Sequence, residues 1–171
     1  MNKARGRTGI LTVLGLWLAL GGMAAAATRN WKNTGTDWGT AANWVENAVP
    51  VGTDTVVIPS VPTNQPTIAD ARSISNLTIN GNNPTPLWNI GGAGTLTIDG
   101  GTVTFQTGGQ ALMSCNLALN GNTSFIVGPY SQPPTLWLLG TLTGTGPLNQ
   151  TLLSGWNNFW APSPACRPAT W

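Results

Sequence analysis

Short stretches in which apolar and polar residues alternate recur along most of the chain. Four of them share one pattern, with Leu at the second place, Ile or Leu at the fourth and Gly at the sixth; they begin at Asn76, Thr95, Asn116 and Thr135. Alternation with a period of two places the apolar pair on one face of a β-strand. Because the glycines lie at positions 81, 100, 121 and 140, the pattern returns about every 20 residues, which predicts a β-solenoid.

Stacking of successive copies at about 4.8 Å would align their apolar side chains in one continuous column. We expect this column to contain Leu77, Leu96, Leu117 and Leu136. The glycine that ends each copy permits a sharp corner. A second strand follows two of these corners, at 102–105 and 124–127.

An earlier and less regular copy precedes the first of the four. Its apolar pair, Val56 and Ile58, lies one repeat length before Leu77 and Ile79, which identifies a first rung. We therefore assign residues 54–149 to the rungs of the solenoid.

The same short strands also fit a β-sandwich. A sandwich would place the four leucines on antiparallel strands in two facing sheets, whereas a solenoid requires parallel strands. The fold class is therefore all-β, with a short parallel β-helix as the prediction and a β-sandwich as the alternative.

Residues 1–27 have the layout of a secretory signal peptide. Basic residues at positions 3, 5 and 7 precede an apolar run at 10–20 and a run of alanines at 24–27, so we expect cleavage after Ala27. The apolar run is too short to cross a bilayer core of about 30 Å comfortably, and no later stretch of the sequence could span one. We expect an exported protein, extracellular or at the cell surface, with the periplasm as an alternative.

Residues 28–53 are rich in tryptophan and in turn-forming residues. Trp31, Trp38 and Trp44 are spaced by seven and six. The end of a solenoid must be covered, because an open coil exposes unpaired strands, so we predict that these residues form an N-terminal cap. In the alternative, Trp38 and Trp44 contact a ligand and stack on sugar rings through their aromatic faces.

The alternating pattern stops after Asn149. Residues 150–171 contain three tryptophans and three prolines and show no strand alternation, so we expect an irregular C-terminal tail. Two interpretations stay open: the tail covers the last rung, or it marks a truncated reading frame of a longer repeat protein.

Trp137 stands at the alternating place between Leu136 and Leu138. We therefore expect it to point outward. An exposed tryptophan on a flat sheet is a candidate ligand contact.

The two cysteines, Cys115 and Cys166, allow a disulfide if the protein is exported. A bridge would tie the tail to the solenoid. Two unpaired thiols are the open alternative, because two cysteines do not make a disulfide framework.

Charge and residue types argue against several classes of function. Beyond residue 27 the chain has four basic and five acidic residues and no histidine. It therefore has no basic surface for nucleic acid, and it lacks the histidine of catalytic triads and of many metal sites. Asp70 and Arg72 could serve a polysaccharide lyase, but we interpret them as a solvated surface pair. We expect no catalytic residue, no metal and no cofactor.

A family resemblance rests on the order of motifs near the N-terminus. Asn30-Trp31, Asp37-Trp38-Gly39 and Asn43-Trp44 are followed by Pro50, Asp54, Val56-Val57-Ile58-Pro59 and Ile74-Ser75-Asn76-Leu77-Thr78-Ile79. This order resembles the N-terminal part of large bacterial autotransporter-like or adhesin-like surface proteins. The resemblance implies a right-handed parallel β-helix, secretion, and a scaffold or adhesive role at the cell surface.

These observations favour a secreted or cell-surface structural and adhesive β-solenoid with no catalytic activity of its own. Its expected partners are extracellular glycans or cell-surface components. The alternative is a carbohydrate-binding module, and a polysaccharide lyase or hydrolase on a β-helix is a third hypothesis.

Overall fold

The computed structural model describes residues 25–59, 63–81, 88–107, 110–127, 135–145, 148–152 and 158–160. These residues form fourteen β-strands and one short 3-10 helix, η1 (Ala41–Asn43). Most of the predicted signal peptide lies outside the described residues, as does the chain from residue 161 onward with Cys166.

The strands form three sheets, and all neighbouring strands within them are parallel. The first sheet contains β1 (Thr28–Asn30), β2 (Thr55–Ile58), β4 (Asn76–Gly81), β7 (Thr102–Thr107), β10 (Thr123–Val127) and β13 (Leu148–Leu152). The second contains β5 (Trp88–Ile90), β8 (Gln110–Met113), β11 (Thr135–Leu138) and β14 (Asn158–Trp160). The third contains β3 (Ala71–Ile74), β6 (Thr95–Asp99), β9 (Asn116–Asn120) and β12 (Leu142–Gly144).

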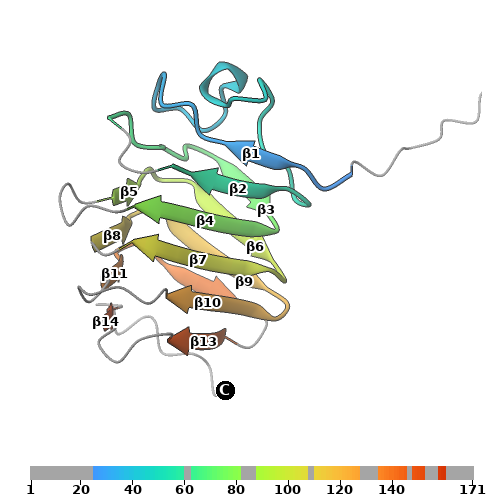
Figure 1. The fold of residues 1–171 in the computed structure, drawn as a ribbon. Helices are drawn as coiled ribbons and strands as arrows, with labels where there is room; N and C mark the ends of the chain where they lie inside the picture. Colours follow the sequence, from blue (N-terminus) through green and yellow to red (C-terminus); the bar gives the residue numbers. More distant parts are fainter. Residues whose placement is uncertain are drawn as a thin grey trace, which may run out of the picture.

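Successive coils run through the three sheets in a fixed order. β4 lies in the first sheet, β5 in the second and β6 in the third, and β7 then returns to the first sheet beside β4. Viewed along the axis from the N-terminal end, the chain turns clockwise as it recedes, so the coil is right-handed (Figure 1). The predicted right-handed parallel β-helix is confirmed, and the parallel pairing excludes the β-sandwich.

The register of the coils differs from the expected one. Leu77, Leu96 and Leu136 do not share a column, because they lie in the first, third and second sheet. Leu77 pairs with Val103 instead of Leu96, whereas Leu96 does pair with Leu117. Each turn of the coil contains one strand in each of the three sheets, and strands of all three sheets carry the alternating Leu-x-Ile or Leu-x-Leu pattern. One copy of the pattern therefore marks one strand of a coil and not a full turn.

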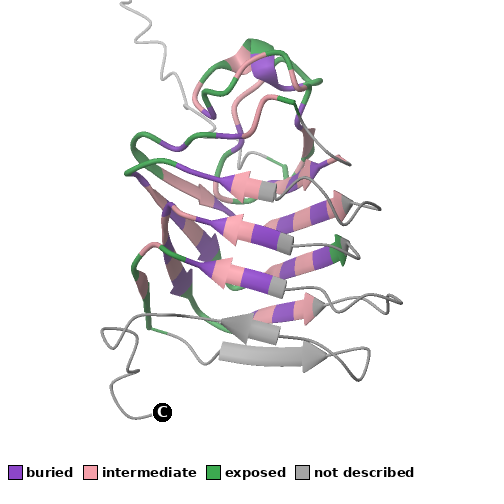
Figure 2. Ribbon diagram, turned by 90° about the vertical axis from the view of Figure 1, so that its left-hand side faces the viewer, coloured by how far each residue is buried: buried purple, intermediate pink, exposed green. Residues whose placement is uncertain are grey.

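Side chains that point into the coil form continuous apolar columns. One column in the first sheet consists of Val56, Leu77, Val103 and Phe125, and a second of Ile58, Ile79 and Phe105. All seven are at most 2 % exposed, and the first-rung pairing of Val56 with Leu77 is as predicted. Buried and half-buried residues alternate along the strands (Figure 2). At roughly 25 cal/mol per Å² of apolar surface removed from water, these columns dominate the stabilisation of the fold.

An asparagine and a glycine hold two stacked corners close together, with Asn76 in the corner between β3 and β4 and Gly101 in the corner between β6 and β7. Asn76 Oδ1 accepts a hydrogen bond from the N–H of Thr102 in the next coil at 2.9 Å. The residue before that donor is Gly101, where a Cβ would overlap the carbonyl oxygen of Ser75. Glycine is therefore required at this place by the close approach of the preceding coil.

The corners before β9 and β12, which connect the second sheet to the third, use the same pair of residue types. Asn116 Oδ1 accepts a hydrogen bond from Thr141 N–H at 3.0 Å, and a Cβ on Gly140 would overlap the carbonyl oxygen of Cys115. Gly100 serves differently, because its φ of +66° lies in the left-handed region that glycine adopts without strain. Glycine is thus required at the predicted corners for two different reasons. At Gly140 the neighbouring coil leaves no space for a Cβ, and at Gly100 the backbone is left-handed.

Strands β13 and β14 extend the solenoid into the segment that we expected to be irregular. β13 pairs with β10 and β14 pairs with β11, both in parallel. The prediction of an irregular tail from residue 150 is therefore wrong for 150–152 and 158–160. These strands lack the Leu-x-Ile pattern, and pairing between backbones leaves no mark in the sequence.

We expect Gly101→Ala to lower the free energy of unfolding by about 2 kcal/mol, because the added methyl group forces two coils apart. Urea unfolding followed by circular dichroism measures the loss. Gly52→Ala is the matched control: its Cβ would lie 3.4 Å from the nearest heavy atom, Ser73 Oγ, so its stability should stay within about 0.5 kcal/mol of the wild type. Equal unfolding midpoints for the two variants would contradict the close-approach explanation.

Candidate functional site

The cap segment, residues 28–53, continues the backbone ladder of the coils (Figure 1). On one side β1 pairs with β2 in the first sheet. On the side of the second sheet, Trp38 N–H donates to Thr67 O at 3.0 Å and Thr67 N–H donates to Thr36 O at 2.6 Å. Ile68 N–H in turn donates to Gly91 O at 2.8 Å. The cap is therefore fixed to the first complete coil by hydrogen bonds on two sides.

Three indole rings fill the space inside the cap. Trp44 packs edge-to-face on Trp31, with ring centroids 5.0 Å apart, and on Trp38, with centroids 4.9 Å apart. Trp44 Nε1 donates to Trp38 O at 2.9 Å and Trp31 Nε1 donates to Asn64 O at 2.8 Å. Edge-to-face pairs of this kind add about 0.5–1.5 kcal/mol to the stabilisation from burial.

The indoles of the cap offer no surface to a ligand. Trp31 is 1 % exposed, and Trp38 and Trp44 are both 0 % exposed. A sugar ring cannot stack on an aromatic face that is covered on both sides. The placement of Trp38 and Trp44 therefore fits the capping interpretation and argues against the stacking platform.

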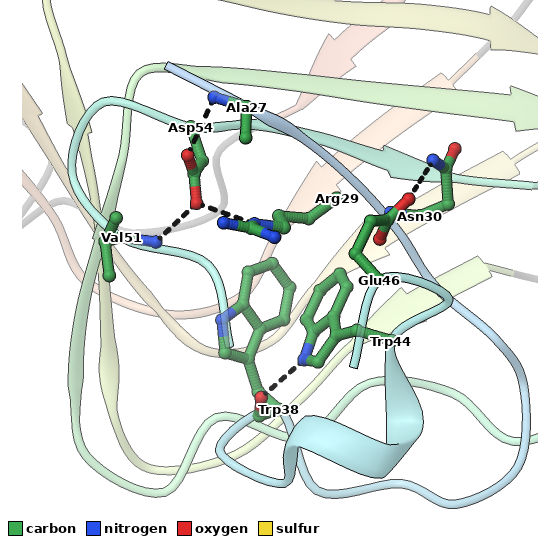
Figure 3. Close-up of polar contacts among 8 residues, drawn as sticks. All are labelled: Ala27, Arg29, Asn30, Trp38, Trp44, Glu46, Val51 and Asp54. Atoms are coloured by element: carbon green, nitrogen blue, oxygen red, sulfur yellow. Dashed lines mark hydrogen bonds and ion pairs between the residues drawn. The ribbon is translucent and has the colours of Figure 1, made fainter. Parts of the chain in front are cut away.

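Arg29 and Asp54 form an ion pair beside the indoles (Figure 3). Arg29 is in register with Val56, so it ends the apolar column of the first sheet. Its Nε lies 3.0 Å from Asp54 Oδ2, and the Asp54 side chain is 0 % exposed. Val51 N–H also donates to Oδ2 at 3.1 Å, and Ala27 N–H donates to Oδ1 at 2.9 Å. The buried carboxylate thus joins β1, the turn before β2 and the residue before β1.

The pKa of Asp54 reflects two opposing effects. Burial raises the pKa, because it disfavours the charged carboxylate. The hydrogen bonds from Arg29, Val51 and Ala27 and the positive charge of Arg29 outweigh burial and hold the pKa below its usual value. The alternating pattern did not identify this pair. The scarcity of charged residues in the sequence could have identified it, since a charged residue beside an apolar strand requires a partner.

Asp70 and Arg72, the pair considered for lyase chemistry, bind each other at the rim of the cap. Arg72 Nε donates to Asp70 Oδ1 at 2.6 Å and Arg72 Nη2 donates to Asp70 Oδ2 at 2.7 Å. The Asp70 side chain is 60 % exposed, and the Arg72 guanidinium packs against Gly39 of the cap. This arrangement fits a surface pair that fastens the cap to the first coil.

Trp137 lies on the outer side of the second sheet. Its neighbours Leu136 and Leu138 are each 4 % exposed, whereas Trp137 itself is half-buried. Its register partners are Leu112 in β8 and Trp160 in β14. Of the three tryptophans predicted as ligand contacts, Trp137 is the one that retains accessible surface.

Cys115 lies in the core, 1 % exposed, and forms no disulfide within the described residues. Burial raises its pKa to about 11, so the thiol stays protonated at neutral pH and is a poor nucleophile. Cys166 lies outside the described residues, and the disulfide between them stays a prediction.

The outer face of the first sheet carries columns of small uncharged side chains. Val57, Thr78, Thr104 and Ile126 are in register from β2 to β10, and all four are half-buried. A second column pairs Thr55 with Asn76 and Thr102 with Ser124. Hydroxyl, amide and methyl groups thus repeat on one face at the spacing of the coils, about 4.8 Å.

Charged residues are concentrated at the N-terminal end of the solenoid. Between residues 73 and 166 the sequence contains one charged residue, Asp99. Asp99 accepts hydrogen bonds from Ser73 Oγ and, at 3.0 Å, from Asn120 Nδ2, so it belongs to a polar ladder on the third sheet. The outer face of the first sheet from β4 onward therefore carries no charge among its described residues.

The described part of the chain contains neither a cluster of metal-ligating side chains nor a helix that could span a membrane. No group of three or more cysteine, aspartate or glutamate side chains gathers there as a metal site would require. No helix in the same residues has the length and apolar character to cross a membrane.

We expect the ion pair to make the stability of the protein depend on pH in the acid range. Because the folded-state pKa of Asp54 is depressed, its stabilisation is complete above the unfolded-state pKa, about 3.9, and is lost as the pH falls through the folded-state pKa. Asp54→Asn should cost about 2 kcal/mol at pH 7, and this difference from the wild type should shrink toward pH 2. Urea unfolding at a series of pH values measures it, with Asp99→Asn as a surface control. A difference that does not change with pH would contradict this role for Asp54.

Comparison of the chain with protein-family models, curated proteins and solved structures gives no match in any of the three. The resemblance to autotransporter-like and adhesin-like proteins therefore stays a prediction.

Proposed function

We propose that the protein is an exported structural and adhesive β-solenoid, displayed at the cell surface or released outside the cell, with no catalytic activity of its own. The signal-like sequence at 1–27 and the N-terminal order of motifs support export. The parallel β-solenoid supports a scaffold role, because it stacks many short strands into a rigid body with long flat faces.

The uncharged outer face of the first sheet is the observation that carries this proposal. Thr78, Thr104 and Ile126 lie in register on it. Such a face contacts another surface through hydroxyl hydrogen bonds and methyl packing, and little water must be removed from charged groups. Attraction between uncharged surfaces is also insensitive to salt, because ionic screening acts on charges. The partner that fits best is a neutral surface rich in hydroxyl groups, such as an uncharged polysaccharide.

We expect a charge placed on this face to weaken adhesion. In cells that display the chain, Thr104→Lys puts an ammonium between Thr78 and Ile126, and contact with a neutral coating must then desolvate that charge. Retention of the cells on dextran under flow should fall about tenfold. It should change little for the wild type between roughly 0.05 and 0.5 M salt.

Thr97→Lys is the matched control, because it makes the same substitution on the third sheet, where Thr97 is also half-buried. Its retention should equal that of the wild type. Equal losses for both variants, or wild-type retention that disappears at high salt, would overturn the assignment of the contact face.

A second candidate function is carbohydrate binding through Trp137. The half-buried indole stands between two buried leucines on the outer side of β11, so one part of the ring is available while the other is held by packing. Aromatic rings on sheet surfaces bind the apolar faces of sugars. Leu112, in register with Trp137, widens the apolar area on this side.

Trp137→Ala should reduce glycan binding about tenfold, roughly 1.4 kcal/mol, while the β-sheet spectrum stays unchanged. A glycan array with the purified protein identifies the ligand, and titration calorimetry measures the loss. Thr97→Ala on the third sheet serves as the control. A wild-type signal at background level on the array would reject this candidate and leave the scaffold proposal in place.

A further inference from the structure

Ala27 is the first residue whose backbone is tied into the fold by hydrogen bonds of the described chain. Its N–H donates to Asp54 Oδ1 at 2.9 Å, and its carbonyl oxygen accepts a hydrogen bond from Thr55 N–H at 2.8 Å. Ala25 and Ala26 are exposed, whereas Ala27 is half-buried. The boundary between leader and fold therefore lies before Ala27, one residue earlier than the predicted cleavage site.

The sequence alone does not choose between cleavage before and after Ala27. Signal peptidases require small residues one and three places before the cut. Ala26 and Ala24 satisfy this rule for a cut before Ala27, and Ala27 and Ala25 satisfy it for a cut after Ala27. Of these two cuts, only the first preserves both hydrogen bonds of Ala27.

We propose that cleavage occurs between Ala26 and Ala27 and that the new α-amino group of Ala27 forms an ion pair with the buried carboxylate of Asp54. The signal peptidase adds water across the Ala26–Ala27 peptide bond. Ala26 leaves with a carboxylate, and Ala27 receives the amine, which takes up a proton at neutral pH. This inference rests on the export that we propose for the protein.

The charges around Asp54 favour a second cation there. Oδ2 accepts hydrogen bonds from Arg29 and Val51, and Oδ1 accepts the one from Ala27. Burial raises the pKa of Glu46, but hydrogen bonds from Asn30, with a smaller contribution from the charge of Arg29, outweigh burial and hold the pKa below its usual value. Before cleavage, the charge of Arg29 acts on both carboxylates, Asp54 and Glu46. An ammonium at Ala27 balances this group of charges.

Cleavage also strengthens a bond that already exists. The donor atom stays the nitrogen of Ala27, but a neutral amide becomes an ammonium with three N–H groups. Charge-assisted hydrogen bonds are about twice as strong as neutral ones, and the carboxylate of Asp54 is 0 % exposed, where solvent screens the interaction least. Processing of the leader would therefore stabilise the cap in the same step that releases the protein.

The ion pair is tested with three chains that begin at Ala25, Ala27 and Thr28 and extend to the C-terminus, each released from a cleavable tag without extra residues. We expect the chain from Ala27 to have a melting temperature about 3–5 °C above that of the chain from Ala25 at pH 6. The chain from Thr28 should be the least stable, because it lacks both hydrogen bonds of Ala27. In an Asp54→Asn background the advantage of Ala27 over Ala25 should disappear. A chain from Ala25 as stable as the chain from Ala27, or an advantage that survives Asp54→Asn, would overturn the ion pair.

The cleavage site is tested on the full chain expressed with its own leader in a bacterial host. The intact mass of the secreted protein should correspond to a chain that begins at Ala27. A secreted chain that begins at Thr28 would overturn this cleavage site while export itself stands. A protein retained with its leader would overturn both. Because the stability comparison uses purified chains, its outcome does not depend on export.

Discussion

The parallel backbone ladder between successive coils is the constraint on which the rest of the structure depends. It holds neighbouring strands about 4.8 Å apart, so each side chain stacks on the one in register with it. Apolar residues such as Leu77 and Val103 form columns inside, and uncharged residues such as Thr78 and Thr104 form columns outside. Where the coils turn tightly the ladder leaves no space for a Cβ, as at Gly101. It also leaves two ends that must be closed.

At the N-terminal end, tryptophan and charge close the solenoid together. The indole of Trp44 contacts both other rings of the cap, and its burial covers the apolar interior that the first coil would expose. The ladder also ends on a polar pair, because Arg29 takes the inward place above Val56. Arg29 is half-buried and balances the fully buried carboxylate of Asp54, since a buried charge without a partner is strongly destabilising. The strength of the cap therefore depends on an interaction between two segments that are 25 residues apart.

The sequence was sufficient for the type of fold, because alternation and recurring glycines are local properties. It predicted the pairing of Val56 with Leu77 and of Leu96 with Leu117. It placed Leu77 and Leu96 in one column incorrectly. The three strands of one coil have similar sequences, so each strand looks like a separate repeat. The strands at 148–152 and 158–160 were missed because backbone pairing there does not require an alternating pattern of side chains.

The candidate site was less predictable than the fold. Only tertiary packing buries Trp38 and leaves Trp137 partly accessible, although the outward orientation of Trp137 follows from its place between two leucines on a strand.

The location of the cap at the beginning of the chain has a consequence for how the protein is made. A ribosome delivers Trp31, Trp38 and Trp44 before any complete coil, so the residues that close this end are made first. Each later coil finds its ladder partner in the coil made just before it, as Leu77 finds Val56 and Val103 finds Leu77. No coil must wait for a distant segment. The solenoid can therefore grow by templated addition in the direction of synthesis, and its growing edge always lies at the most recently made coil.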